Sequence, residues 1–296
     1  MAIDRESDGV ILVIEPRPRD LGGFTVRRLL PAAGHRMVGP FIFLDHMGPA
    51  AMEPGAGIDV RPHTHIALAT VTYLFEGQII HRDTLGSELA IDPGDVNWML
   101  AGRGIAHSER SSSEMRARGV RLHGIQSWVA LPIAHEEDAP AFMHHPASTL
   151  PRLSRDGADL TVIAGTAYGA RSPVGVLSPT LYVDARLQPG ARLEVDATHP
   201  QRAVQVAEGA VRIGERRLVS GTMAVLHVGA PVVVEAEEPA RVMLLGGGPL
   251  DGERHIWWNF VSSSKDRIER AKDDWRSGRF GKVFNDEKEF IPLPES

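Results

Sequence analysis

The feature that most constrains the fold of this chain is the grouping of its apolar residues in the first half. Apolar runs over residues 70–75, 78–81 and 89–91 are short, and each one is followed by a turn sequence rich in glycine, proline or aspartate. Short runs between turn residues are typical of strands and not of helices. The 30 glycines and 21 prolines of the 296 residues also favour many tight turns. We therefore predict an antiparallel β-sheet.

The composition and charge exclude several kinds of protein. The chain has no cysteine, which excludes disulfides, zinc ribbons, iron–sulfur clusters and thiol nucleophiles. Any metal must therefore bind histidine and carboxylate side chains. The formal net charge of −6 gives no support for nucleic-acid binding. The charged N-terminus lacks an apolar run of signal length, so we expect a cytoplasmic protein with no membrane segment.

The second half of the chain repeats the rhythm of the first. The strand and turn over residues 204–209 resemble those over 72–77, and the segment 219–223 resembles 92–96. Duplication of one β-module is the simplest explanation.

This repeat sets the expected domain boundaries. We predict an N-terminal barrel over residues 1–135, a polar, proline-containing linker over 136–150, and a C-terminal barrel over 151–296 that also carries a helix and a tail.

The sequence predicts one clear helix near the C-terminus. Ser263 is the expected N-cap, Gly278 the expected end, and residues 290–294 form an extended tail that we expect to pack on a domain. The apolar face of this helix consists of Ile268, Ala271 and Trp275.

Among the 13 histidines, two short patterns indicate a metal site: His63-Thr64-His65 and His107-Ser108-Glu109. Residues i and i+2 of a strand point to the same face. If the two strands are neighbours, three imidazoles and one carboxylate converge, a set that suits a first-row divalent metal and leaves coordination positions open. The alternative is two unrelated surface pairs.

These residues resemble the two motifs of the cupin superfamily. Gly57, then His63 and His65, and Gly77 at the end of a strand match its first motif. Pro93-Gly94-Asp95 followed by Gly104-Ile105-Ala106-His107 matches the second.

More narrowly, the chain resembles the pirin family from about residue 20 to its end. The most specific segment is Ala101-Gly102-Arg103-Gly104-Ile105-Ala106-His107-Ser108-Glu109. The other segments that carry the resemblance are Gly39-Pro40-Phe41, Leu44-Asp45-His46, residues 93–99 and residues 124–128.

The resemblance implies an all-β bicupin, with two cupin-type antiparallel β-barrels and a short C-terminal helix. It implies one divalent metal ion in the N-terminal barrel, Fe(II) first, with Mn, Ni, Co, Cu and Zn as alternatives. The metal ligands that carry over are His63, His65, His107 and Glu109. The motif-one glutamate of other cupins has no counterpart here, because Ala69 or Thr70 occupies its place.

The repeat also predicts that the second barrel holds no metal. Equivalent offsets from Gly209 and Gly221 place Val195, Ala197 and Val234 at the positions of the three histidines. We interpret His199 and His227, the nearest histidines, as non-ligands.

The chain departs from the common pirin pattern beside the first histidine pair. Ile66 and Ala69 replace an arginine and a glutamate, which predicts a less charged pocket. Trp98, Met99 and Trp128 are candidates to line that pocket, with plain barrel core as the alternative. Four residues are candidates to support the ligands: His81, Arg103, His123 and Gln126. For each of them an ordinary structural or surface role is the alternative.

Two functions from different classes remain open. Several pirins resemble quercetin 2,3-dioxygenases, which would make this chain an oxidoreductase acting on a flavonol or another aromatic enol, with Glu109 as general base. Other pirins are regulators that bind a transcription factor or a metabolic enzyme. A third reading is a metal that only stabilises the barrel.

Overall fold

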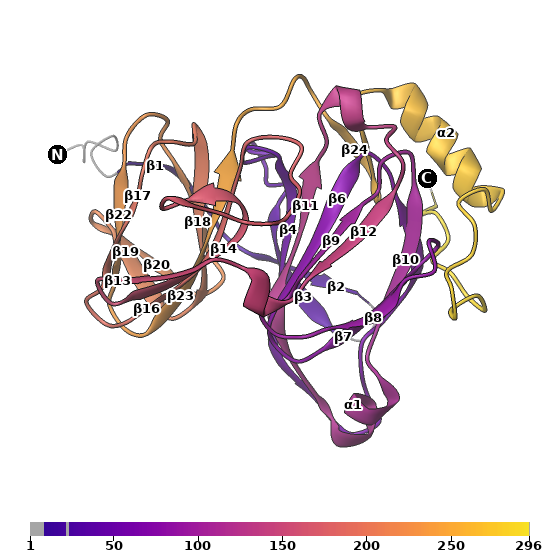
Figure 1. Ribbon diagram of the computed structural model, residues 1–296, viewed down its shortest axis with the longest axis horizontal. Coiled ribbons are helices and arrows are strands. Elements are labelled where there is room, and N and C mark those ends of the chain that lie inside the picture. The colour runs from indigo at the N-terminus through magenta and orange to yellow at the C-terminus, as the bar shows by residue number, and fades with distance from the viewer. Residues whose placement is uncertain (1–8, 22–23, 296) are drawn as a thin grey trace. The chain divides into compact units, whose positions relative to one another are not determined.

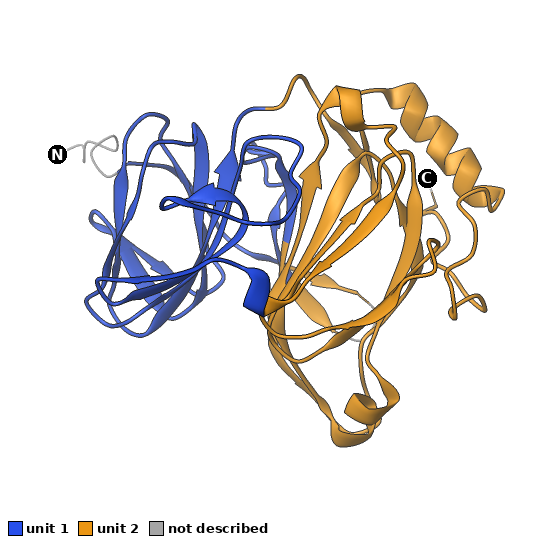
Figure 2. Ribbon diagram, viewed as in Figure 1, with its two compact units in different colours: residues 1–17, 27–44, 148–249 blue, residues 18–26, 45–147, 250–296 orange. Residues whose placement is uncertain are grey.

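The computed structural model describes residues 9–21 and 24–295, and Figure 1 labels its elements along the chain. The described residues form two compact units, coloured separately in Figure 2. Unit 1 takes its residues from 1–17, 27–44 and 148–249, and unit 2 from 18–26, 45–147 and 250–296. This grouping differs from the continuous boundaries expected from the sequence. The N-terminal segment belongs to unit 1, which is built mainly from the second half of the chain, and the C-terminal segment belongs to unit 2, which is built mainly from the first half.

Unit 1 contains two antiparallel sheets. Its larger sheet is made, in spatial order, of β1 (Val10–Ile14), β21 (Met223–Leu226), β18 (Gln201–Glu208), β23 (Ala240–Gly247), β16 (Thr180–Leu187), β14 (Ala158–Ala167) and β13 (Arg152–Arg155), with β15 (Ala170–Arg171) also paired to β14. Its smaller sheet is made of β17 (Arg192–Val195), β22 (Val232–Ala236), β19 (Ala210–Ile213) and β20 (Arg216–Val219). The N-terminal strand therefore completes the barrel formed by the second half of the sequence.

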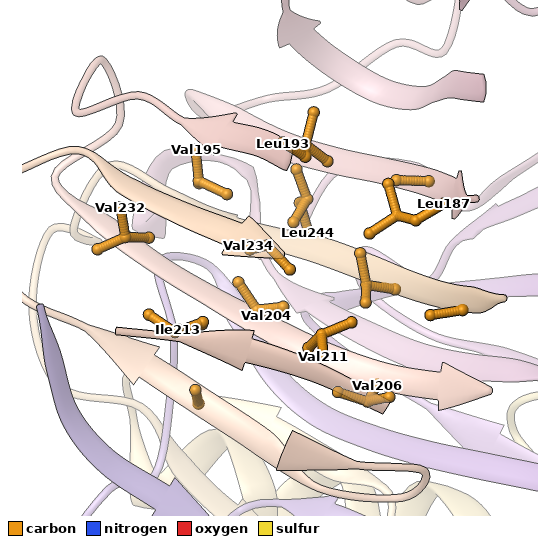
Figure 3. Packing of buried hydrophobic residues seen from close by; sticks show 14 of the residues in the cluster. Leu187, Leu193, Val195, Val204, Val206, Val211, Ile213, Val232, Val234 and Leu244 are labelled. Atoms are coloured by element: carbon orange, nitrogen blue, oxygen red, sulfur yellow. The ribbon is translucent and has the colours of Figure 1, made fainter. Parts of the chain in front are cut away.

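The core of unit 1 follows from strict alternation along short strands. In β17, Leu193 and Val195 are buried while Arg192 and Glu194 are exposed. Successive side chains of a strand point to opposite faces, so one face of each sheet becomes apolar. Figure 3 shows these aliphatic side chains packed between the strands.

Unit 2 contains the other two large sheets. One sheet is made of β5 (Asp59–His65), β10 (Ile105–Arg110), β7 (Ile79–Asp83) and β8 (Glu88–Ile91). The other is made of β12 (Ala141–His145), β9 (Val96–Leu100), β6 (Leu68–Glu76), β11 (Val120–Ala130), β4 (Phe41–Met52), β3 (Thr25–Leu30) and β2 (Arg17–Asp20), and the chain passes between the units within β3 and β4. A separate hairpin joins β24 (His255–Trp257) to β25 (Phe260–Ser262).

The four helical segments of the described chain are short. They are α1 (Ser113–Arg118), α2 (Lys265–Arg276) and two 3₁₀ turns, Ile133–His135 and Ala147–Thr149. None of the helices in the described ranges has the length and apolar character needed to cross a lipid bilayer. The expected all-β architecture of two antiparallel barrels with one short C-terminal helix is confirmed.

Helix α2, yellow in Figure 1, forms where the sequence predicts it and covers unit 2. Its predicted apolar face is buried in a cluster with Ile66, Ala106 and Phe260. Ser264, not Ser263, is the N-cap, because its side chain accepts the hydrogen bond of the Arg267 backbone N–H. The buried face consists of Ile268, Ala271 and Trp275.

The C-terminal tail packs on the same unit, as expected. The backbone N–H of Ile291 donates to the carbonyl of Pro62, at 2.8 Å. The indole N–H of Trp275 donates to the carbonyl of Ile291, at 3.0 Å. The tail is thus tied to strand β5, which also carries two of the predicted metal ligands.

Most of the segment predicted as a linker, residues 136–147, belongs to unit 2, and residues 148–150 belong to unit 1. Strand β12 pairs with β9, and Phe142 lies opposite Met99 in this pairing. At the start of the segment, Glu136 forms a buried ion pair with Arg254, at 3.0 Å. The carboxylate also accepts hydrogen bonds from the hydroxyl groups of Ser262 and Ser263. The predicted linker therefore contains a paired strand and a buried, hydrogen-bonded carboxylate.

We expect Arg254→Met to lower the free energy of unfolding by about 3 kcal/mol, because Glu136 would stay buried without its cation. Arg254 is completely buried, while Glu136 is 7% exposed. Chemical denaturation of the full chain measures the effect. The matched control is Arg192→Met in the exposed pair with Glu235, where we expect a change below about 1 kcal/mol. Equal losses in the two variants would contradict the assignment.

Candidate metal centre

Strands β5 and β10 bring the two predicted histidine motifs together. They pair in antiparallel fashion, with His107 directly opposite His63. His65 lies two residues further along β5 and therefore on the same face. The Nε2 atoms of His65 and His107 are 3.1 Å apart. The three histidines each offer a ligand atom, and these atoms all lie within 4.8 Å of one another.

Backbone carbonyls orient two of these rings. The Nδ1 atom of His63 lies 2.9 Å from the carbonyl oxygen of Arg61, and that of His65 lies 3.2 Å from the carbonyl oxygen of Asn259. Since a carbonyl only accepts, each Nδ1 must carry the proton and donate. This leaves the lone pair on Nε2, the tautomer that a metal ligand needs.

Burial keeps all three imidazoles neutral. It lowers the pKa of His63 and lowers the pKa values of His65 and His107 well below the ordinary histidine value. Neutral imidazoles each offer one nitrogen lone pair, and here these lone pairs lie close together. One divalent cation can bind all of them. The three histidines therefore suit the metal that the sequence predicts.

Glu109 lies beside this group but does not belong to the set of mutually close ligand atoms. A β-bulge separates it from His107 in the pairing with β5. Its carboxylate accepts hydrogen bonds from Gln126 Nε2, at 2.9 and 3.0 Å, and from the Thr72 hydroxyl, at 3.2 Å. The side chain is 4% exposed. Its role as fourth ligand stays a prediction.

The opposite sheet supplies the aromatic walls of the site. Trp128, Thr70, Met99 and Phe142 lie side by side across β11, β6, β9 and β12. The Trp128 ring lies edge-on to His65, with ring centroids 5.1 Å apart. Directly paired residues share a face, so Met99 lies on the same side as Trp128. Trp98 alternates to the other face of this sheet and is buried there, away from the site.

His81 is the candidate support residue that lies closest to the histidine group. Its ring centroid is 5.3 Å from that of His107 and stacks on Phe142 at 4.2 Å. Its Nε2 donates to Asp83, at 3.1 Å. Burial acts to raise the pKa of the Asp83 carboxyl, but the hydrogen bonds from His81 and from the Ser87 backbone outweigh it and lower the pKa.

Of the other three candidates, only Gln126 is hydrogen-bonded to a predicted ligand in the described part of the chain. Gln126 holds Glu109, as described above. His123 instead pairs with His46, with their Nε2 atoms 2.8 Å apart. The side chain of Arg103 is exposed. Its backbone carbonyl accepts a hydrogen bond from Arg267.

Sequence reasoning missed three residues of this site, namely Thr72, Asp83 and Phe142. Asp83 could have been found, since it follows His81 at the same i+2 spacing as the ligand pairs. Phe142 could not, because it lies in the segment interpreted as a linker.

Comparison with known proteins decides the family. The family model described as Pirin matches residues 23–129, and that described as Pirin C-terminal cupin domain matches residues 182–281. The chain belongs to the pirin family. A pirin-like protein of Caulobacter vibrioides is 53% identical over 96% of this chain and 99% of its own length. Human pirin is 32% identical over 93% of this chain and 94% of its own length.

Solved structures agree with this assignment. The crystal structure of quercetin 2,3-dioxygenase from Acinetobacter baumannii matches with a TM-score of 0.90 and 32% sequence identity. The match covers 97% of this chain and 96% of that one. The pirin architecture of two cupin barrels therefore applies to nearly the whole chain.

In the second pirin barrel, aliphatic side chains occupy the places of the histidines. Leu193 pairs with Val234 and Val195 pairs with Val232, between strands that correspond to β5 and β10. If Val234 takes the place of His107, its strand partner Leu193 takes the place of His63. The offset in the sequence predicts Val195 there, two residues further along. Either register gives apolar residues at these places, and Figure 3 labels Leu193, Val195 and Val234 in the core.

We expect the metal-free protein to lose stability as the pH falls below about 6.5. The pKa values of His63, His65 and His107 are lowered in the folded state, so the unfolded chain binds more protons in this range. The free energy of unfolding is highest at pH values above the histidine pKa of the unfolded chain. It falls as the pH drops from there towards the lower pKa values of the folded state. Each linked proton adds up to about 1.4 kcal/mol per pH unit.

Denaturation curves between pH 7.5 and 5 check this expectation. In His65→Gln, one titrating group is removed, so the decline should be shallower than in the unmodified chain. An equal slope in both proteins would show that other groups cause the acid sensitivity.

Proposed function

We propose that this protein is a metal-dependent dioxygenase that acts on a flavonol of the quercetin type or a similar aromatic enol. The observation that carries the proposal is the group of three buried, neutral histidines with a carboxylate beside it. The name of the Acinetobacter baumannii protein, quercetin 2,3-dioxygenase, supplies the substrate class. A divalent cation held by the histidines would provide Lewis-acid and redox chemistry; we propose Fe(II), with Glu109 as a fourth ligand.

The residues around the histidines suit a flat, hydroxylated substrate. Trp128 and Phe142 provide aromatic surfaces against which a planar ring system can pack. Glu109 is the group that would take the proton of the substrate hydroxyl. Gln126 and Thr72 donate hydrogen bonds to its carboxylate and hold it in place. Burial of the site limits the access of water.

The decisive experiment loads the full chain with Fe(II) in the absence of oxygen, adds quercetin and then admits oxygen. We expect release of carbon monoxide and loss of the flavonol absorbance. The same assay with manganese, nickel, cobalt, copper and zinc tests the choice of metal. The flavone that differs from quercetin only by lacking the 3-hydroxyl group is the matched control, because it offers no 3-hydroxyl proton for Glu109 to remove.

A protein that binds these metals stoichiometrically but releases no carbon monoxide with any of them would overturn the proposal. That outcome would favour the second candidate, a regulator whose metal changes its binding to a protein partner.

A further inference from the structure

Unit 1 contains a cavity that the proposed reaction does not use. It has a volume of about 340 Å³ and is lined by residues of β14, β15, β16, β17, β23 and the loop after β17. Its buried floor is formed by Leu181, Val195 and Leu244. Figure 3 labels Val195 and Leu244 within the apolar core of this barrel. The volume lies near the lower end of the range for small-molecule sites.

His199 is the polar exception among the buried residues described as lining this cavity. Its side chain is 7% exposed. Its Nε2 lies 3.0 Å from the carbonyl oxygen of Thr166, so this nitrogen must donate. In the neutral ring Nδ1 then carries a lone pair, and within the described part of the chain it makes no hydrogen bond. A ligand that donates to this lone pair gains a hydrogen bond inside a largely apolar cavity.

The wall beside His199 is aromatic. Tyr168 lines the cavity, and its hydroxyl donates to the carbonyl of Glu194 at 2.8 Å, which fixes the ring. The guanidinium of Arg155 lies 5.1 Å from the centroid of this ring. The charged lining residues, Arg171 and Asp196, are exposed. The buried part of the cavity therefore offers apolar surface and one hydrogen-bond acceptor, with no ionic partner for a charged ligand.

We propose that this cavity is a second binding site, separate from the histidine group, for a small uncharged phenol. The ring of the phenol packs on Leu181, Val195 and Leu244, and its hydroxyl donates a hydrogen bond to Nδ1 of His199. A hydrocarbon of the same size leaves the acceptor unpaired, and a benzoate brings a charge that the floor cannot pair.

The test uses phenol itself as the probe, on the full metal-free chain, by calorimetry and by NMR of the imidazole nitrogens. We expect saturable binding and a shift of the His199 Nδ1 resonance, with toluene and benzoate about tenfold weaker. The His107→Ala variant should bind phenol equally well, which separates this cavity from the proposed active site.

Two variants probe the site from different directions. His199→Phe removes the acceptor, and Val195→Phe fills the floor while leaving the histidine in place. Both should weaken phenol binding about tenfold or more, whereas the control His227→Asn, outside the cavity, should not. The nitrogen shift needs no variant and so does not depend on how these fold. Absence of that shift, or equal binding of toluene, would overturn the proposal.

Discussion

Replacing Glu109 with glutamine should lower flavonol turnover about 100- to 10,000-fold, the usual contribution of a general base. Glutamine keeps the size of the side chain but cannot accept the proton of the substrate hydroxyl. Gln126 and Thr72 donate hydrogen bonds to the carboxylate of Glu109, and no cationic side chain among the described residues forms an ion pair with it. Carbon monoxide release under anaerobic loading and oxygen addition measures the loss.

The matched control is Glu76→Gln, at an exposed carboxylate of the same unit that pairs with Arg121. Turnover in this variant should not change. Metal content, measured on the same samples, then separates the two roles of Glu109. Loss of metal together with turnover assigns it as a ligand, and retention assigns it as a base. Full turnover in Glu109→Gln would contradict both.

Removing His107 should weaken metal binding by about a thousandfold or more, because even groups that only hydrogen-bond to a ligand commonly contribute 10- to 100-fold. His107 is next to both other histidines: it lies opposite His63 in the strand pairing, and its Nε2 atom is 3.1 Å from that of His65. Titration of His107→Ala with Fe(II), Ni(II) and Zn(II), followed by calorimetry, measures the change. The rise in melting temperature on adding metal should disappear with it.

The control for this variant is His135→Ala. His135 is 39% exposed and pairs with Asp138 on the surface of the same unit. The His135→Ala variant should bind one metal ion with unchanged affinity. If His107→Ala still bound one equivalent as tightly as the unmodified chain, the three-histidine site would not be the metal centre.

The parts of the fold that were predictable are those set by local patterns. Short apolar runs bounded by turn residues located strands such as β6 and β8, and the spacings of three and then four residues between Ile268, Ala271 and Trp275 located helix α2. The i+2 spacing of His63 and His65 also placed both rings on one face of a strand. Their meeting with His107 followed from the family resemblance and not from periodicity.

The parts that were not predictable depend on contacts between distant segments. Nothing near Phe142 in the sequence indicates that it would stack on His81, because that contact arises from the pairing of β12 with β9. The contact between His65 and the backbone carbonyl of Asn259 could not be predicted either, because every residue type has such a carbonyl. The cap of α2 moved from Ser263 to Ser264 because Ser263 is used by Glu136.

The bond between His65 and Asn259 joins residues that are 194 positions apart. During synthesis on the ribosome, His65 therefore emerges long before the group that fixes its ring. Domains generally begin to fold from the N-terminal end as the chain is made. The nascent barrel would meet cellular metal ions with this imidazole still free to rotate. Metal uptake by a fixed His65 ring is thus expected only after the segment around Asn259 has been made and has folded against β5.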